Sequence, residues 1–236
     1  MTQRPTRGLI QQKPSASKTG KGPDLGKPVK IAAATLLLAV VVWTLWPSSL
    51  ADVTNLGSRG TSIVAFGDSL TAGYGATTEE SYPAKLASMI GEEVVNAGVS
   101  GDTTESARER LEMDVLSRTP RIVIVGLGGN DFLRGVAISD TETNLRTIVR
   151  KIQASGAMVV ILGYRFPSFK ANYEKMYARV AKEEGSFLIP DLLDGITSDR
   201  ELKSDEIHPN ARGYQLMAER VAGEMRKLIA KANAAK

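Results

Sequence analysis

The feature that most constrains the fold is a regular alternation of short apolar runs with longer helical stretches between residues 62 and 232. Most of the runs are rich in β-branched residues, and turn-forming residues flank them. They lie at Ser62–Phe66, Val94–Ala97, Ile122–Val125, Met158–Leu162 and Phe187–Ile189. Because runs that are apolar on both faces alternate with helices, we predict a central parallel sheet between two helical layers, a three-layer α/β domain.

Helices are expected between these strands and after the last one. Their approximate ranges are Ser81–Ile90, Thr104–Leu116, Ser139–Ser155, Asn172–Glu184 and Asn210–Ala232. Ser139 and Glu142 have the spacing of a capping box, in which both side chains accept hydrogen bonds from free backbone amides at a helix start. Asp102 and Glu105 are interpreted as the start of a helix, because such side chains more often hydrogen-bond nearby backbone than do chemistry.

Four candidate functional residues occupy comparable positions in this pattern. Ser69, Gly101 and Asn130 each follow a predicted strand, and His208 precedes the last helix. Ligands bind to open parallel sheets beyond the carboxyl ends of the strands. We therefore expect these residues to meet at one edge of the sheet.

Ser69 lies in the stretch Phe66-Gly67-Asp68-Ser69-Leu70, where a glycine-supported turn would push its hydroxyl out of the sheet, as a nucleophile requires. The tripeptide alone more often marks an ordinary turn. His208 is the only histidine, so it must be the base if there is one, and Asp205 could orient it. Taken singly, His208 could mark a solvated helix start and Asp205 could be a surface carboxylate.

An acyl-transfer site also needs hydrogen-bond donors for the developing oxyanion. The side-chain amide of Asn130 and the backbone N–H groups of Gly101 and Ser69 are the candidates. Asn130 and Gly101 could equally be plain turn residues. Asp68 and Asp131 are expected to hydrogen-bond neighbouring turn backbone rather than to do chemistry.

Composition excludes several other classes of site. The chain has no cysteine and one histidine, which rules out thiol nucleophiles, disulfides and cysteine or histidine metal clusters, and no metal or organic cofactor is indicated. Residues 1–30 carry seven basic residues and one acidic residue, which leaves 23 basic against 25 acidic residues in the remainder. The remainder is thus not basic, and we expect no nucleic-acid partner.

The amino-terminal part is predicted to be an export or anchoring segment. Residues 1–30 are expected to be disordered, and residues 31–47 are expected to form a transmembrane anchor around the apolar run Ile31–Trp46. Residues 48–61 are expected to be a linker, and residues 62–236 are expected to form the catalytic domain. The basic flank predicts a cytoplasmic amino terminus, an inner-membrane anchor and a periplasmic domain. The alternative is a signal peptide that is cleaved after Ala51, which would release the domain into the periplasm.

The motifs together resemble those of the GDSL, or SGNH, hydrolase family, in particular its bacterial periplasmic branch of acyl-CoA thioesterases, lysophospholipases and arylesterases. They are Phe66–Leu70, Asn96–Thr103 around Gly101, Leu127–Gly135 around Asn130, and Asp205–His208. The resemblance covers Ser62 to Leu228. It implies a flavodoxin-like three-layer fold, a catalytic set of Ser69, Asp205 and His208, and an oxyanion hole made by Ser69, Gly101 and Asn130.

The function expected from the residues and the resemblance is hydrolysis of fatty-acyl or aryl esters and thioesters through an acyl-enzyme. The substrate would be a small-molecule or lipid ester, the loop Gly163–Pro167 would touch it, and the protein would be a monomer. One alternative is a deacetylase of envelope carbohydrates. The other is a membrane-tethered binding domain with an inactive site.

Overall fold

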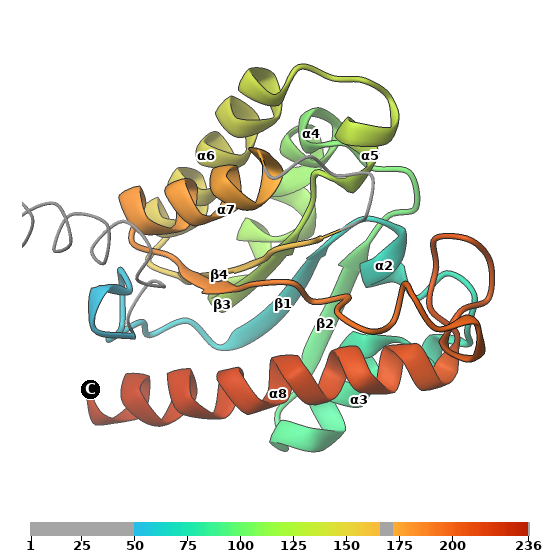
Figure 1. Ribbon diagram of the computed structural model, residues 1–236. Helices are drawn as coiled ribbons and strands as arrows, with labels where there is room; N and C mark the ends of the chain where they lie inside the picture. Colours follow the sequence, from blue (N-terminus) through green and yellow to red (C-terminus); the bar gives the residue numbers. More distant parts are fainter. Residues whose placement is uncertain (1–49, 166–171, 236) are drawn as a thin grey trace, which may run out of the picture. The chain divides into compact units, whose positions relative to one another are not determined.

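A five-stranded, entirely parallel sheet in the order β2-β1-β3-β4-β5 forms the centre of the domain (Figure 1). The structure, a computed structural model, describes residues 50–165 and 172–235, all of them within the compact unit that extends from Pro47 to Lys236. The strands are β1 (Ser62–Gly67), β2 (Val94–Gly98), β3 (Pro120–Gly126), β4 (Met158–Leu162) and β5 (Phe187–Ile189). The predicted three-layer α/β fold and its five strands are confirmed.

Helices cover both faces of the sheet. They are α2 (Ser69–Ala72), α3 (Tyr82–Ile90), α4 (Thr104–Asp114), α5 (Gly129–Leu133), α6 (Ile138–Ala154), α7 (Asn172–Glu183) and α8 (Ala211–Ala234). Short 3-10 turns occur at η1 (Leu50–Asp52), η2 (Thr78–Glu80), η3 (Leu116–Arg118) and η4 (Arg200–Leu202). In Figure 1, α3 and α8 pack together below the sheet, while α4, α6 and α7 lie above it.

The core follows from the apolar composition of the strands. All five residues of β4 are buried, as are Ile63 to Gly67 of β1, so both faces of these strands lie against helices. The helix α8 contributes a stripe of buried residues at a spacing of three and four, which is typical of an amphipathic helix. Its members include Tyr214, Met217, Val221, Met225 and Leu228.

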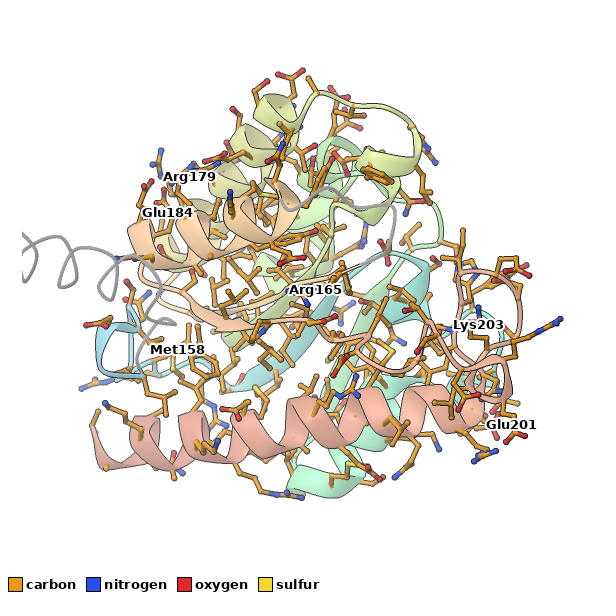
Figure 2. All side chains as sticks on the ribbon, in the orientation of Figure 1. Met158, Arg165, Arg179, Glu184, Glu201 and Lys203 are labelled. Carbon is orange, nitrogen blue, oxygen red and sulfur yellow. The ribbon has the colours of Figure 1, made fainter. Side chains whose placement is uncertain are left out.

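The prediction of a capping box at Ser139 and Glu142 is wrong. The helix α6 begins at Ile138 after Ala137, whose side chain cannot accept a hydrogen bond. Glu142 instead accepts hydrogen bonds from Arg146 on α6 and from Arg179 on α7, which is labelled in Figure 2. Charge-assisted bonds to guanidinium groups are stronger than a helix cap, and they draw the carboxylate toward α7.

The helix α4 starts where Asp102 and Glu105 predict it, and Thr103 and Ser106 cap it. Thr103 is the cap residue, and its hydroxyl accepts a hydrogen bond from the backbone N–H of Ser106. The Ser106 hydroxyl accepts one in return from the Thr103 N–H at 2.9 Å. Asp102 lies just before the cap residue, and its carboxylate accepts from the Ser106 hydroxyl at 3.1 Å and from Arg110 Nε at 2.6 Å.

Much of the stretch expected to be a linker packs against the domain. Val53 is 5% exposed and belongs to the core, and the Thr54 N–H donates to the Gly185 carbonyl at 2.8 Å. The Asn55 side chain donates to the carbonyls of Gln153 and Ala157, between α6 and β4. The chain therefore joins the domain near the amino ends of the strands.

Among the described helices, none combines the length and apolar character that a bilayer crossing requires; the run 31–46 lies outside the described residues.

Candidate active site

The nucleophile candidate Ser69 is the first residue of α2, two residues after Gly67 at the carboxyl end of β1. The Asp68 carboxylate caps this helix by accepting a hydrogen bond from the Leu70 N–H at 3.0 Å. Gly67 is required at the turn, because a Cβ atom there would overlap the Thr71 side chain and the Gly126 carbonyl oxygen. The turn thus presents the Ser69 hydroxyl beyond the end of the sheet, as the sequence predicts.

Ser69, His208 and Asp205 form a continuous chain of hydrogen bonds. The Ser69 Oγ atom lies 3.0 Å from His208 Nε2, and His208 Nδ1 lies 2.8 Å from Asp205 Oδ2. Asp205 can only accept at Nδ1, so that nitrogen carries the proton and Nε2 is free to accept one from the hydroxyl. The geometry is that of an activated serine, formed by residues 139 positions apart in the chain.

The Asp205 carboxylate is held in its ionised form. Partial burial raises its pKa, but the backbone N–H groups of His208 and Ile207, both at 2.8 Å from Oδ1, and the bond to the imidazole lower it more. The net result is a pKa of about 2. The side chain is 44% exposed, so these local bonds, rather than exclusion of water, keep it charged.

The loop that carries His208 is held at several points. The Ser204 N–H donates to the His208 carbonyl at 2.9 Å, and Asn210 caps α8 by accepting from the N–H groups of Arg212 and Gly213. The ring of Tyr74 lies against the imidazole, with the two ring centroids 4.6 Å apart. Tyr74 was not among the residues singled out in the sequence, where nothing distinguishes it from an ordinary loop aromatic.

The oxyanion candidates lie beside the nucleophile turn. Asn130, in α5, directs Nδ2 toward Asp68 Oδ2 at 3.4 Å and donates to the Asp102 carbonyl at 3.0 Å. Gly101 has φ of +87°, which L side chains rarely adopt, and its carbonyl accepts from the Arg134 guanidinium at 2.7 Å. The structure therefore brings Asn130 into contact with the residue before Ser69 and with the residue after Gly101.

Three aspartates surround this part of the site. Asp68 is 2% exposed, and burial, opposed by the Leu70 bond and aided by the charges of Asp102 and Asp131, raises its pKa to about 7. The expectation that Asp68 caps its own turn is confirmed. Asp131 does not bond its neighbouring turn: it accepts from the Thr104 N–H at 2.9 Å and the Thr104 hydroxyl at 2.5 Å, and so ties α5 to α4.

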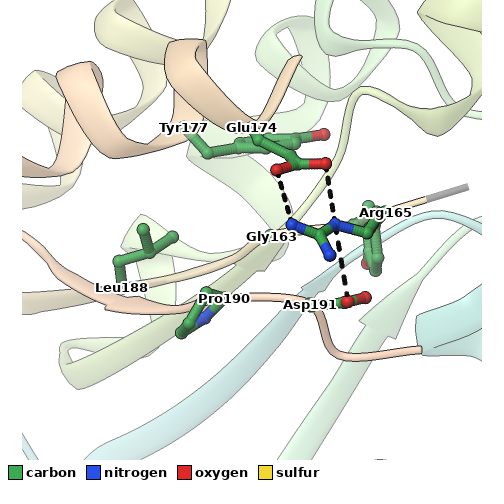
Figure 3. Close-up of a pocket in the computed structure, with 8 residues that line it drawn as sticks. Gly163, Arg165, Glu174, Tyr177, Leu188, Pro190 and Asp191 are labelled. Atoms are coloured by element: carbon green, nitrogen blue, oxygen red, sulfur yellow. Dashed lines mark hydrogen bonds and ion pairs between the residues drawn. The ribbon is translucent and has the colours of Figure 1, made fainter. Parts of the chain in front are cut away.

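A separate hollow of about 70 Å³ lies at the carboxyl ends of β4 and β5 (Figure 3). Arg165 crosses it and donates from Nε and Nη2 to Glu174 at 2.8 and 2.9 Å, while Asp191 Oδ2 lies 3.7 Å from Nε. Ser69, His208 and Asp205 do not line this hollow. In the described ranges, no group of three or more acidic or histidine side chains is placed to hold a metal ion.

Known proteins resemble this chain over the same region that carries the site. The model of the GDSL-like lipase/acylhydrolase family matches residues 65–216. Thioesterase 1/protease 1/lysophospholipase L1 of Escherichia coli (strain K12) is 31% identical over 176 residues, which cover 71% of this chain and 85% of that protein. The arylesterase of Vibrio mimicus is 33% identical over 176 residues, 70% of this chain and 88% of that protein. The crystal structure of TesA matches with a TM-score of 0.67 at 31% identity and covers 71% of this chain and 99% of that one.

Proposed function

The chain belongs to the GDSL-like lipase/acylhydrolase family, and from this premise we propose that Ser69, His208 and Asp205 are its catalytic triad. The protein is a serine hydrolase of ester substrates. The observation that carries the proposal is the unbroken series of contacts from Ser69 Oγ to His208 Nε2 at 3.0 Å and from His208 Nδ1 to Asp205 Oδ2 at 2.8 Å. A binding domain with an inactive site has no need of this arrangement.

In the acylation step the Ser69 oxygen attacks the carbonyl carbon of the substrate while its proton passes to His208 Nε2. The carbonyl π electrons move onto oxygen and form a tetrahedral oxyanion. When this intermediate collapses, the bond to the leaving alkoxide or thiolate breaks, and the leaving group takes the proton from Nε2. The ionised Asp205 stabilises the imidazolium that exists between the two proton transfers.

Deacylation repeats the sequence with water as the nucleophile. His208 Nε2 removes a proton from the water, the resulting tetrahedral intermediate expels the Ser69 oxygen, and that oxygen recovers the proton. The products are the free acid and the starting enzyme. The Ser69 N–H, the Gly101 N–H and the Asn130 amide would stabilise the oxyanion in both steps, each more strongly in the transition state than in the ground state.

We further infer a preference for fatty-acyl or aryl esters and thioesters. The supporting observations are the names of the relatives, which describe a thioesterase, a lysophospholipase and an arylesterase. A carbohydrate deacetylase is the competing enzyme class, and its acyl pocket has to accommodate only an acetyl group.

Acyl-chain profiling with p-nitrophenyl esters distinguishes these two classes. We expect hydrolysis of the octanoate ester with a kcat/KM at least equal to that for the acetate ester, because an apolar acyl chain adds binding energy on transfer from water. The purified domain would be assayed with the acetate, butyrate and octanoate esters. Turnover of acetate alone would contradict the acyl-ester assignment and favour the deacetylase.

We propose that the amino-terminal segment delivers this domain to the periplasm. The proposal rests on the apolar run Ile31–Trp46 and on the lysines that precede it, because basic residues stay on the cytoplasmic side. A retained anchor is preferred to cleavage after Ala51, since the basic lead is longer than the usual start of a signal peptide.

A further inference from the structure

The side chain of Arg110 connects parts of the active site that lie far apart in the sequence. It extends from α4, is 17% exposed, and ends between the carboxyl ends of β1 and β2. Its Nη2 donates to the Gly67 carbonyl at 3.0 Å, its Nη1 to the Ala97 carbonyl at 2.9 Å, and its Nε to Asp102 Oδ2 at 2.6 Å. Nη1 also donates to Asp114 Oδ2 at 2.8 Å, within its own helix. The guanidinium carbon lies 4.5 Å from the centre of the Phe66 ring.

These contacts join the nucleophile turn to the oxyanion loop. Gly67 ends β1 two residues before Ser69, and Asp102 directly follows Gly101. A guanidinium is planar and presents its N–H groups in fixed directions, so three simultaneous bonds define the relative positions of the groups that accept them. A shift of the oxyanion loop away from β1 would stretch at least one of these bonds.

Asp102 links the Arg110 side chain to the proposed oxyanion donors. Arg110 holds its carboxylate, while Asn130 Nδ2 donates to its carbonyl at 3.0 Å. We propose that Arg110 is a positioning residue, which sets the distance from Ser69 to the donors of Gly101 and Asn130. This inference rests on the proposed function, namely that Ser69 is the nucleophile and that Gly101 and Asn130 supply oxyanion donors.

The test is the substitution Arg110→Lys. Lysine keeps the charge and can reach one acceptor, but a single ammonium group cannot reproduce three bonds in fixed directions. Misplacement of catalytic groups by about 1 Å can cost about 100-fold. We expect kcat for p-nitrophenyl butyrate to fall by about 10- to 100-fold, while KM changes by less than about threefold, because the oxyanion contacts act in the transition state.

Arg121→Lys is the matched control. Arg121 is also largely buried, with 12% of its side chain exposed, and it also pairs with a carboxylate, Glu92 at 2.6 Å. It lies near the start of β3, at the amino end of the sheet, away from the catalytic edge. We expect its kcat to stay within about twofold of the wild type, whatever the substitution does to the melting temperature. Asn130→Ala removes a proposed oxyanion donor outright. Its loss of kcat is therefore the largest loss that displacing this donor could cause.

A second readout separates positioning from general stability. A trifluoromethyl ketone substrate analogue adds to the serine and forms an oxyanion, so its affinity should weaken in Arg110→Lys in proportion to kcat/KM. Asp102→Asn should lower kcat in the same direction, and the double variant should lose less than the product of the two single losses, because both act through one contact. If Arg110→Lys does not fold, the kcat of Asp102→Asn alone tests the positioning role.

Two results would overturn the inference. One is a kcat within about threefold of the wild type in a folded Arg110→Lys or Asp102→Asn enzyme. The other is an equal loss in Arg121→Lys, which would mark a general effect of removing a buried guanidinium. Neither result bears on the proposed function, which would fail separately if the wild-type enzyme did not turn over esters through Ser69.

Discussion

Replacing Ser69 by alanine is expected to lower kcat by about 10⁴- to 10⁶-fold, while the protein stays folded. The reason is that no acyl-enzyme can form without the Ser69 oxygen, which lies 3.0 Å from Nε2 of the proposed base His208. The methyl group of alanine fits the space of the hydroxymethyl group, and the α2 cap comes from Asp68 rather than from Ser69. The measurement is steady-state hydrolysis of p-nitrophenyl butyrate, with circular dichroism to show that the fold is retained.

Ser62→Ala serves as the control for this substitution. Ser62 lies at the opposite end of the same strand, where its hydroxyl donates to the Arg118 carbonyl at 3.0 Å. We expect this variant to keep wild-type kcat, since it loses one exposed hydrogen bond far from the site. A Ser69→Ala enzyme with more than about a tenth of wild-type activity would be incompatible with the assignment.

The second large effect is expected from Asp205→Asn, which should reduce kcat by about 10⁴-fold without abolishing activity. An asparagine amide at the position of Oδ2 would donate to His208 Nδ1 instead of accepting from it. The proton would then sit on Nε2, the nitrogen that must accept from Ser69. Because the carboxylate has a pKa of about 2, it is ionised throughout the neutral range, and the loss should appear at every pH above about 5.

Asp199→Asn is the matched control for this variant. Asp199 lies in the same irregular segment before α8 and also accepts a backbone hydrogen bond, from the Glu201 N–H at 2.9 Å. An asparagine oxygen can accept the same bond, so kcat should be unchanged. An Asp205→Asn enzyme with wild-type kcat/KM would refute the pairing of Asp205 with His208.

Features of the fold and the site that depend on local sequence patterns could be predicted from the sequence. The β-branched runs gave the strands, and each predicted strand overlaps the observed one because buried parallel strands are continuously apolar. The rule that sites lie at the carboxyl ends of such strands brought Ser69, Gly101 and Asn130 to one edge. His208 could be singled out because the chain has one imidazole.

The parts that sequence could not predict depend on contacts between distant segments. Glu142 looked like a helix cap, but Arg179 on a neighbouring helix binds it. Arg110 is one of several arginines, and no local pattern shows that its side chain reaches both β1 and β2. Val53 lies in a stretch rich in turn residues, yet it is buried because a surface of the domain is available to it.

The most direct test of the central claim is covalent labelling of the wild-type protein with a fluorophosphonate, followed by peptide mass spectrometry. A serine activated by His208 attacks phosphorus and displaces fluoride, which leaves a stable adduct on its oxygen. We predict a single adduct on the peptide that contains Ser69, loss of esterase activity in step with labelling, and no adduct in Ser69→Ala. Complete loss of activity with the adduct on any residue other than Ser69 would contradict the account.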